Sequence, residues 1–246
     1  ALPILGCMGP KSLVMVRNNK SFLDLILEQV ENLNREWKQK IPVLLMNSFY
    51  THKDTQAHLN SLNFSSEIIG FQQNKFPRLH AGNLNPLTPE KWGDQTFYPP
   101  GHGDFFQCVS QQGILQRLID EGREILFMSN ADNLGAVMDP VILNYMDEFN
   151  IPFLMEMTPK TSADVKGGTL YQVDGNLKLL EIAQVPDDKV DDFCDQNKFK
   201  VFNTNNIWVS LIALNKRLSQ GPLNLTVLVN EKKLGDTPIV QLETAI

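Results

Sequence analysis

The feature that most constrains the fold is a regular alternation of strand-like and helix-like segments between residues 13 and 157. Short apolar runs such as Pro42–Met46 are typical of strands buried on both faces. The expected strands are Leu13–Val16, Pro42–Met46, Ser66–Phe71, Glu124–Met128 and Ile151–Met157. The expected helices cover 21–37, His52–Leu62, Phe105–Ile119 and a segment starting at Asp139-Pro140, with Ser21 and Asp139 as the N-caps of the first and the last. This order predicts an α/β fold with a mostly parallel central sheet flanked by helices.

The pattern changes after Thr158, where the sequence predicts an added antiparallel β portion. Val165–Gln172 and Leu177–Gln184 flank Asp174-Gly175, and Asp-Gly between two strand-like runs is a strong hairpin indicator. Lys200–Val209 reads as a later strand and Leu211–Leu218 as a short helix. The longest expected loop is Gly82–Gln95.

Composition excludes some classes of partner. The net charge of −6 argues against a nucleic-acid-binding protein, which usually carries a basic face. No apolar run is long enough to cross a membrane, so we expect no membrane association. Three widely separated cysteines do not form a disulfide framework, which favours a reducing, cytoplasmic compartment.

The stretch Tyr98-Pro99-Pro100-Gly101-His102-Gly103-Asp104 is the most informative local motif. Prolines stiffen the backbone, and glycines let it approach a ligand closely. The motif runs into an expected helix, whose free N–H groups favour anions. Alone it indicates a phosphate or sugar contact, although a lone histidine is more often structural than catalytic.

Other polar segments are compatible with ligand binding or with ordinary turns. Lys11 follows Gly9-Pro10 and can neutralise a phosphate, or it can be a surface lysine beside a turn. Asp132 follows a buried strand, where α/β sheets bind ligands, but Asp and Asn also favour turns and caps. Glu181 sits in an apolar strand-like run, either exposed on one face or buried and paired. The asparagines at 203, 205 and 206 form a dense cluster that turn formation alone would explain.

Taken together and in order, these motifs resemble the eukaryotic type of UDP-glucose pyrophosphorylase, the UTP–glucose-1-phosphate uridylyltransferase family. The motifs that carry the resemblance are Gly9-Pro10-Lys11-Ser12, Phe71-Gln72-Gln73-Asn74-Lys75-Phe76-Pro77-Arg78, Tyr98–Asp104, Ser129-Asn130-Ala131-Asp132-Asn133, Lys166-Gly167-Gly168-Thr169, Leu180–Pro186 and Asn203-Thr204-Asn205-Asn206. The resemblance implies a Rossmann-like sheet of the nucleotide-diphospho-sugar transferase type.

The resemblance also implies roles for individual residues. Lys11 would contact the triphosphate and act in catalysis, Gln73 would read uracil, and Gly101 would contact the base through its backbone. Asp132 would bind the nucleotide and Mg²⁺. The residues implied to contact the sugar or the sugar nucleotide are His102, Asn130, Ala131, Asp132, Gly168, Glu181, Asn203 and Asn205.

The chain departs from the family pattern in two places. The family has a Leu-Asn-Gly-Gly-Leu-Gly loop where this chain reads Ala1-Leu2-Pro3-Ile4-Leu5, and a later phosphate-binding lysine and a C-terminal β-helix domain are not among the 246 residues. We therefore expect residues 1–246 to form a single, incomplete catalytic nucleotidyltransferase domain. Whether the glycine loop is disordered, truncated or lost is left open by the sequence.

The expected reaction is reversible transfer of a uridylyl group from UTP to glucose 1-phosphate, giving UDP-glucose and pyrophosphate with Mg²⁺. Three alternatives stay open: a non-catalytic UDP-sugar-binding fragment or degenerate homologue, a relative of the UDP-N-acetylhexosamine pyrophosphorylases, and a glycosyltransferase-like domain. A homo-oligomer is a further expectation that the sequence does not settle.

Overall fold

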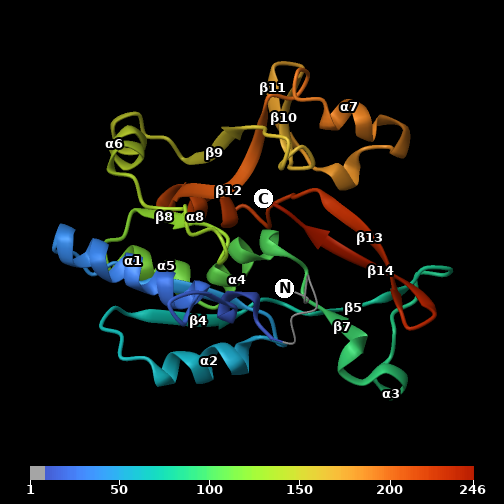
Figure 1. Ribbon diagram of the computed structural model, residues 1–246, viewed down its shortest axis with the longest axis horizontal. Coiled ribbons are helices and arrows are strands. Elements are labelled where there is room, and N and C mark those ends of the chain that lie inside the picture. The colour runs from blue at the N-terminus through green and yellow to red at the C-terminus, as the bar shows by residue number, and fades with distance from the viewer. Residues whose placement is uncertain (1–8) are drawn as a thin grey trace. The chain divides into compact units, whose positions relative to one another are not determined.

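The computed structural model describes residues 9–246, which fall into two compact units. The first unit comprises 9–116, Asn130–Val137 and Gly221–Ile246, and the second comprises Arg117–Ser129 and Met138–Gln220. Both units contain helices and strands (Figure 1). The fold is therefore α/β, as the sequence predicts.

The first unit begins with short elements that lead into its longest helix. A 3-10 turn, η1 (Lys11–Leu13), precedes the hairpin of β1 (Met15–Arg17) and β2 (Lys20–Ser21), so the expected strand at Leu13–Val16 starts two residues later. Helix α1 (Phe22–Trp37) follows. The predicted N-cap Ser21 is confirmed: its hydroxyl accepts a hydrogen bond from the main chain of Asp24 at 3.2 Å, within a complete capping box.

A parallel strand pair follows α1. Strands β3 (Val43–Asn47) and β4 (Ile68–Gln72) run parallel, joined by α2 (His52–Ser61), which contacts β4. This βαβ unit is the arrangement that the apolar run at Pro42–Met46 predicts. Because the strands are parallel, both carboxyl ends lie at one edge, with Asn47 opposite Gln72.

The middle of the first unit is made of short elements. They are β5 (Phe76–Pro77), β6 (Leu79–His80), α3 (Pro89–Trp92), η2 (Gly93–Thr96), β7 (Phe97–Tyr98), η3 (His102–Asp104), α4 (Phe105–Gln111) and α5 (Ile114–Asp120), the last of which crosses into the second unit. The expected long loop at Gly82–Gln95 therefore contains helical turns. The single helix expected over Phe105–Ile119 is interrupted at Gly113, whose positive φ of 73° ends α4.

A long hairpin completes the first unit. Strands β13 (Val227–Leu234) and β14 (Thr237–Thr244) pair antiparallel around a two-residue turn (Figure 1). Strand β14 also pairs with β6. The two strands of the hairpin were not expected from the sequence, because their residues mix polar and apolar types without strict alternation.

The second unit is built on a three-stranded antiparallel sheet. Strand β12 (Val201–Ser210) lies between β8 (Ile125–Met128) and β9 (Phe153–Pro159). Its buried side chains include Ile207 and Trp208, both with no exposed surface. This unit also contains helices α6 (Pro140–Glu148), α7 (Val190–Cys194) and α8 (Leu211–Leu218) and the 3-10 turns η4 (Ile182–Gln184) and η5 (Asp187–Lys189). The predicted N-cap of α6, Asp139, accepts a hydrogen bond from the main-chain N–H of Val141 at 2.8 Å.

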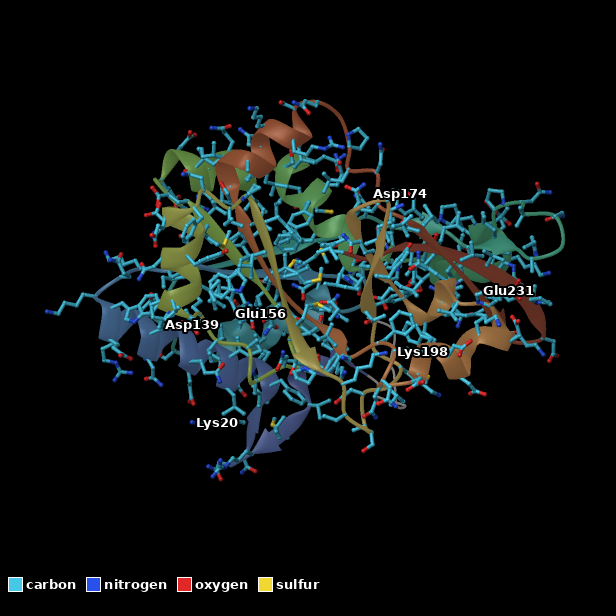
Figure 2. All side chains as sticks on the ribbon, turned by 90° about the horizontal axis from the view of Figure 1, so that it is seen from above. Lys20, Asp139, Glu156, Asp174, Lys198 and Glu231 are labelled. Atoms are coloured by element: carbon cyan, nitrogen blue, oxygen red, sulfur yellow. The ribbon has the colours of Figure 1, made fainter. Side chains whose placement is uncertain are left out.

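The predicted Asp-Gly hairpin is confirmed. Strands β10 (Thr169–Val173) and β11 (Asn176–Leu180) pair antiparallel, and the two turn residues both have positive φ, 51° at Asp174 and 79° at Gly175. Two positive φ angles are what a type I′ hairpin turn requires. Figure 2 labels Asp174 at this turn.

The sheets differ from the prediction in the direction of their strands. Among residues 9–246, β3–β4 is the only parallel pair, and the others are antiparallel. An apolar run predicts that a strand is buried but carries no information on the direction of its neighbour, which explains the difference. No helix in the described part of the chain is both long and apolar enough to span a bilayer.

Candidate functional site

Lys11 and Asp132 form an ion pair within the first unit. Lys11 begins η1, Asp132 lies in the turn after β8, and the Lys11 ammonium donates to the Asp132 carboxylate. The two side chains keep 40% and 32% of their surface exposed, so both groups remain open to a ligand. Two residues 121 positions apart that were predicted to serve the same phosphates are thus brought together.

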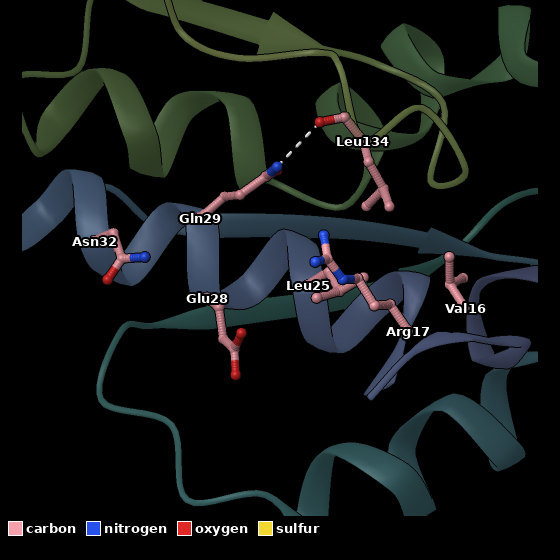
Figure 3. A pocket seen from close by; sticks show the side chains of 7 residues that line it. All are labelled: Val16, Arg17, Leu25, Glu28, Gln29, Asn32 and Leu134. Carbon is pink, nitrogen blue, oxygen red and sulfur yellow. Dashed lines mark hydrogen bonds between the residues drawn. The ribbon is translucent and has the colours of Figure 1, made fainter. Parts of the chain in front are cut away.

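The segment that carries Asp132 is fastened to α1. Gln29 Nε2 donates to the main-chain oxygen of Leu134 at 3.0 Å (Figure 3). A small cavity of about 290 Å³ lies beside this contact, lined also by Arg17 and Leu25. Asn130 and Ala131 are exposed on the same segment, which turns through a hydrogen bond from Asn133 N–H to the Asn130 oxygen at 3.0 Å.

Gln73 follows directly after β4, at the carboxyl edge of the parallel pair. Its main-chain N–H donates to the oxygen of Asn47 at 2.9 Å. Its side-chain oxygen Oε1 is buried and has no hydrogen-bond partner among the described residues. A buried amide oxygen without a donor is costly, and a ligand N–H would satisfy it.

The glycines of the Tyr98–Asp104 motif are explained by packing within the first unit. Gly101 has a φ of 96°, and a Cβ there would stand 2.8 Å from the main-chain oxygen of Thr244. A Cβ on Gly103 would stand 2.6 Å from the Thr244 hydroxyl oxygen. Both glycines therefore allow the chain to pack closely against the end of β14, and Tyr98 reinforces this packing by donating its hydroxyl to the Leu242 oxygen at 2.9 Å.

His102 is held by the residues that follow β14. Its Nε2 accepts a hydrogen bond from the main-chain N–H of Ile246 at 3.1 Å. Burial lowers the pKa of His102 below its usual value, against the opposing influences of the Ile246 hydrogen bond and of Glu243. The imidazole is accordingly neutral at physiological pH, and a neutral ring whose Nε2 accepts must carry its proton on Nδ1.

Asp104 ends the motif as a buried carboxylate that sequence reasoning did not single out. It accepts from Asn74 twice, from the main chain at 2.7 Å and from Nδ2 at 2.9 Å, and from Cys108 Sγ at 3.0 Å. Burial first and Asp104 second raise the pKa of the Cys108 thiol to about 12, so this cysteine stays protonated and unreactive. Asp104 thus links the motif to the segment that carries Gln73.

Four residues predicted to contact the hexose come together in the second unit. Gly168 lies against Glu181, since a Cβ on Gly168 would stand 2.3 Å from Glu181 Oε1. The Gly168 oxygen accepts from the main chain of Asn203 at 2.7 Å. Asn203 Nδ2 donates to Asn205 Oδ1 at 2.9 Å, and the Asn205 N–H donates back to Asn203 Oδ1 at 2.8 Å.

Glu181 differs from the prediction in its local structure. It lies after β11 and caps η4, rather than inside a strand, and its main-chain N–H donates to Gln184 Oε1 at 2.8 Å. Burial raises the pKa of its carboxyl group. A half-buried carboxylate in this position has acceptor oxygens available for ligand hydroxyls.

The asparagine cluster is a bulge in β12. Residues Thr204–Asn206 lie opposite the single residue Glu156 of β9, and Asn205 has a left-handed φ of 58°. The tolerance of Asn for this conformation explains one of the three asparagines on structural grounds alone.

Glu156, labelled on β9 in Figure 2, is the residue that organises this bulge and that the sequence did not reveal. Its carboxylate accepts from Trp208 Nε1 at 2.6 Å and from Asn206 Nδ2 at 3.3 Å, while its main-chain oxygen accepts from Thr204 Oγ1 at 2.8 Å. A glutamate among the apolar residues of a strand beside a buried tryptophan was the available indication.

Metal binding by protein groups alone is not supported in the described part of the chain, which holds no group of three or more His, Cys, Asp or Glu side chains placed to bind a metal ion. The single carboxylate of Asp132 fits Mg²⁺ of the kind that is held by one or two carboxylates and completed by substrate phosphates.

Comparisons with known proteins agree on one family. The family model for UTP–glucose-1-phosphate uridylyltransferase matches residues 3–246. Curated relatives with that name include one from Dictyostelium discoideum, 48% identical over 98% of this chain and 49% of its own length, and one from Hordeum vulgare, 46% identical over 98% and 51%. The chain thus spans about half the length of these relatives.

Solved structures give the same result. A UDP-glucose phosphorylase from Trypanosoma brucei matches with a TM-score of 0.90 and 37% identity, over 97% of this chain and 54% of that chain. A mutant UDP-glucose pyrophosphorylase from Leishmania major, solved in complex with UDP-glucose, matches with a TM-score of 0.88 and 34% identity, over 97% and 55%.

Proposed function

The chain belongs to the UTP–glucose-1-phosphate uridylyltransferase family, and we propose that it carries the nucleotide-binding and sugar-binding residues of an enzyme that makes UDP-glucose from UTP and glucose 1-phosphate. The observation that carries the proposal is that the predicted ligand residues fall into two separate clusters of suitable chemistry. The residues predicted to bind the phosphates and the base lie in the first unit, and the four residues predicted to bind the hexose lie in the second.

The residues of the first unit are suited to a uridine nucleotide. Lys11 supplies a positive charge for the triphosphate, and Gln73 offers a buried acceptor for the N3–H of uracil. Gly101 contacts the base with its backbone, while neutral His102 and the exposed Asn130 and Ala131 face the sugar nucleotide in this proposal.

Asp132 would hold Mg²⁺ together with phosphate oxygens, and the ion would supply charge neutralisation at the reacting phosphates. The ion pair with Lys11 is consistent with this role, because a bound metal and a bound phosphate would give each partner a new counter-charge.

The residues of the second unit are suited to a neutral, hydroxyl-rich ligand. Glu181 has acceptor oxygens for vicinal hydroxyls, and Asn203 and Asn205 have both donors and acceptors. Gly168 leaves room for the Glu181 carboxylate.

In the proposed reaction a phosphate oxygen of glucose 1-phosphate forms a bond to the α-phosphorus of UTP. The bond from that phosphorus to the bridging oxygen breaks, and pyrophosphate leaves with the electron pair. A sugar phosphate is already ionised at neutral pH, so no general base is needed. The contribution of the protein is positioning and stabilisation of charge, with Lys11 adjacent to the departing negative charge.

Several finer expectations belong to the same proposal. The Rossmann-like fold of the nucleotide-diphospho-sugar transferase type is supported by the parallel β3–α2–β4 unit. A single catalytic domain, a cytoplasmic location and a homo-oligomer remain predictions.

The test is to incubate the protein with UTP, glucose 1-phosphate and Mg²⁺ and to follow pyrophosphate release. Rapid release that requires both substrates is the expected result. Binding of UDP-glucose without release would instead support the non-catalytic alternative, and faster release with N-acetylglucosamine 1-phosphate would support the N-acetylhexosamine relative. Release of UDP from UDP-glucose would indicate a glycosyltransferase.

A further inference from the structure

The segment that carries Gln73 is held on both sides of that residue. On one side, Gln112 Nε2 donates to the main-chain oxygen of Gln72 at 2.8 Å. On the other side, Asn74 donates twice to Asp104, from its main chain to Oδ2 and from Nδ2 to Oδ1. All of these residues belong to the first unit.

The hydrogen bonds of Asp104 restrain the position of this segment. Asp104 is buried, with 9% of its surface exposed. Both of its carboxylate oxygens accept hydrogen bonds, from Asn74 and from Cys108. An ionised carboxylate can only accept hydrogen bonds, and charge-assisted bonds of this kind are stronger than neutral ones. The paired bonds to Asn74 therefore determine both its main-chain position and its side-chain orientation.

The position of Asn74 matters because Gln73 precedes it and presents a buried acceptor without a donor. Uracil offers an N–H at its N3 position, whereas the N3 of cytosine is itself an acceptor and would repel the glutamine oxygen. Discrimination between the two bases depends on holding that oxygen within a few tenths of an ångström.

We propose that Asp104 and Asn74 are positioning residues that fix Gln73 and thereby determine the selectivity of this protein for uracil over cytosine nucleotides. The proposal rests on the proposed function of the same site. Neither residue is required to touch the nucleotide.

The disruptive variant is Asn74→Asp. It keeps the main-chain N–H and the side-chain size, but it sets a second carboxylate against Asp104 where Nδ2 and Oδ1 now lie 2.9 Å apart. Repulsion between the two carboxylates displaces the segment. Titration calorimetry with UDP and with CDP at neutral pH should show the UDP-over-CDP preference reduced about tenfold or more.

The rescue is the double variant Asn74→Asp with Asp104→Asn, which exchanges the two side chains. The new Asn amide donates to the new Asp carboxylate, and its oxygen still accepts the main-chain N–H of residue 74. We expect the UDP-over-CDP preference to return to within about threefold of the wild-type value. A defect that arises away from the contact between residues 74 and 104 would not be reversed by this exchange.

The matched control is Asn60→Asp, which makes the same chemical change on the exposed surface of α2 and should leave the preference unchanged. If Asn74→Asp fails to fold by circular dichroism, Asn74→Ala keeps the main-chain bond to Asp104, removes the Nδ2 bonds to Asp104 and Cys108, and should still reduce the preference. A wild-type protein that binds neither nucleotide refutes the proposed function itself. A selective wild type with an equally selective Asn74 variant, or a double variant no better than Asn74→Asp, overturns the positioning role alone.

Discussion

The two units present different chemistry to the two substrates proposed for them. In the first unit the candidate residues are organised by charge: a partly exposed Lys11–Asp132 pair, and a buried Asp104 carboxylate that holds the segment beside Gln73. In the second unit they are organised by neutral amides around Asn203 and Asn205, beside a Glu181 carboxylate that burial makes harder to ionise. Phosphates are bound by charge and sugars by hydroxyl geometry, so the difference matches the proposed ligands.

The largest effect should come from removing the charge of the first unit. Lys11→Ala should lower turnover about 10²–10³-fold, because it removes a positive group at the reacting phosphates. The fold should be retained, since a partly exposed ion pair contributes about 1 kcal/mol or less.

Pyrophosphate release and circular dichroism test this prediction together. Lys20→Ala is the matched control, since Lys20 also pairs with a carboxylate and is similarly exposed. Near-normal turnover in a folded Lys11→Ala protein would remove Lys11 from the catalytic residues.

The next largest effect is expected from Glu181→Gln, which should change sugar binding in the second unit without changing nucleotide binding in the first. Glu181→Gln should raise the KM for glucose 1-phosphate about tenfold and leave the KM for UTP within about twofold, because an acceptor for a sugar hydroxyl is lost. Steady-state kinetics with each substrate varied in turn measures both values. Glu148→Gln, at the exposed end of α6, is the control. Equal increases in both KM values would contradict the separation.

The same Glu181→Gln variant should be more stable than the wild type at neutral pH. A carboxyl group whose folded pKa is raised binds more protons in the folded than in the unfolded state, so its ionisation costs stability as pH rises above about 4.5, the unfolded value. The gain in melting temperature should therefore be absent at low pH and present at pH 7. A variant that is less stable than the wild type at pH 7 would show that Glu181 is paired.

Glu156→Gln should lower the free energy of unfolding of the second unit, because it disrupts the hydrogen bonds that the Glu156 carboxylate accepts. The amide of Gln would set a donor against Asn206 Nδ2 or Trp208 Nε1, at a cost of about 1–3 kcal/mol. Urea unfolding should show this loss. Unchanged stability would mean that the bulge is held without Glu156.

The smallest effect concerns His102 in the first unit. Because burial lowers its folded pKa, the unfolded state takes up a proton first, and stability should fall as pH drops below about 6.5, the unfolded value. His102→Gln keeps an acceptor for the Ile246 N–H and should remove part of that fall. Parallel stability profiles for the two proteins between pH 7 and pH 5 would contradict this assignment.

Local chemistry made part of the fold predictable. The Ser21 and Asp139 caps, the Asp174-Gly175 turn and the buried run at β3 depend on residues a few positions apart, and all were found as expected. Strand direction was not predictable, because the partner of β12 depends on packing between distant segments.

In the candidate site, too, some residues could be selected from the sequence and others could not. Lys11, Asp132, Gly168 and Glu181 could be selected from the sequence, and the structure pairs them as two contacts. Glu156 and Asp104 could not be assigned roles, because their importance lies in hydrogen bonds to residues 30 to 52 positions away. Positioning residues of this kind have no local pattern to recognise.

The most direct test of the account is calorimetric binding of UDP and of UDP-glucose to the wild type, Lys11→Ala and Glu181→Gln. The account predicts that Lys11→Ala weakens both ligands by a similar factor, because both carry the phosphates. Glu181→Gln should weaken UDP-glucose about tenfold and leave UDP unchanged. If Glu181→Gln weakens UDP and UDP-glucose equally, the assignment of charge recognition to one unit and hydroxyl recognition to the other is wrong.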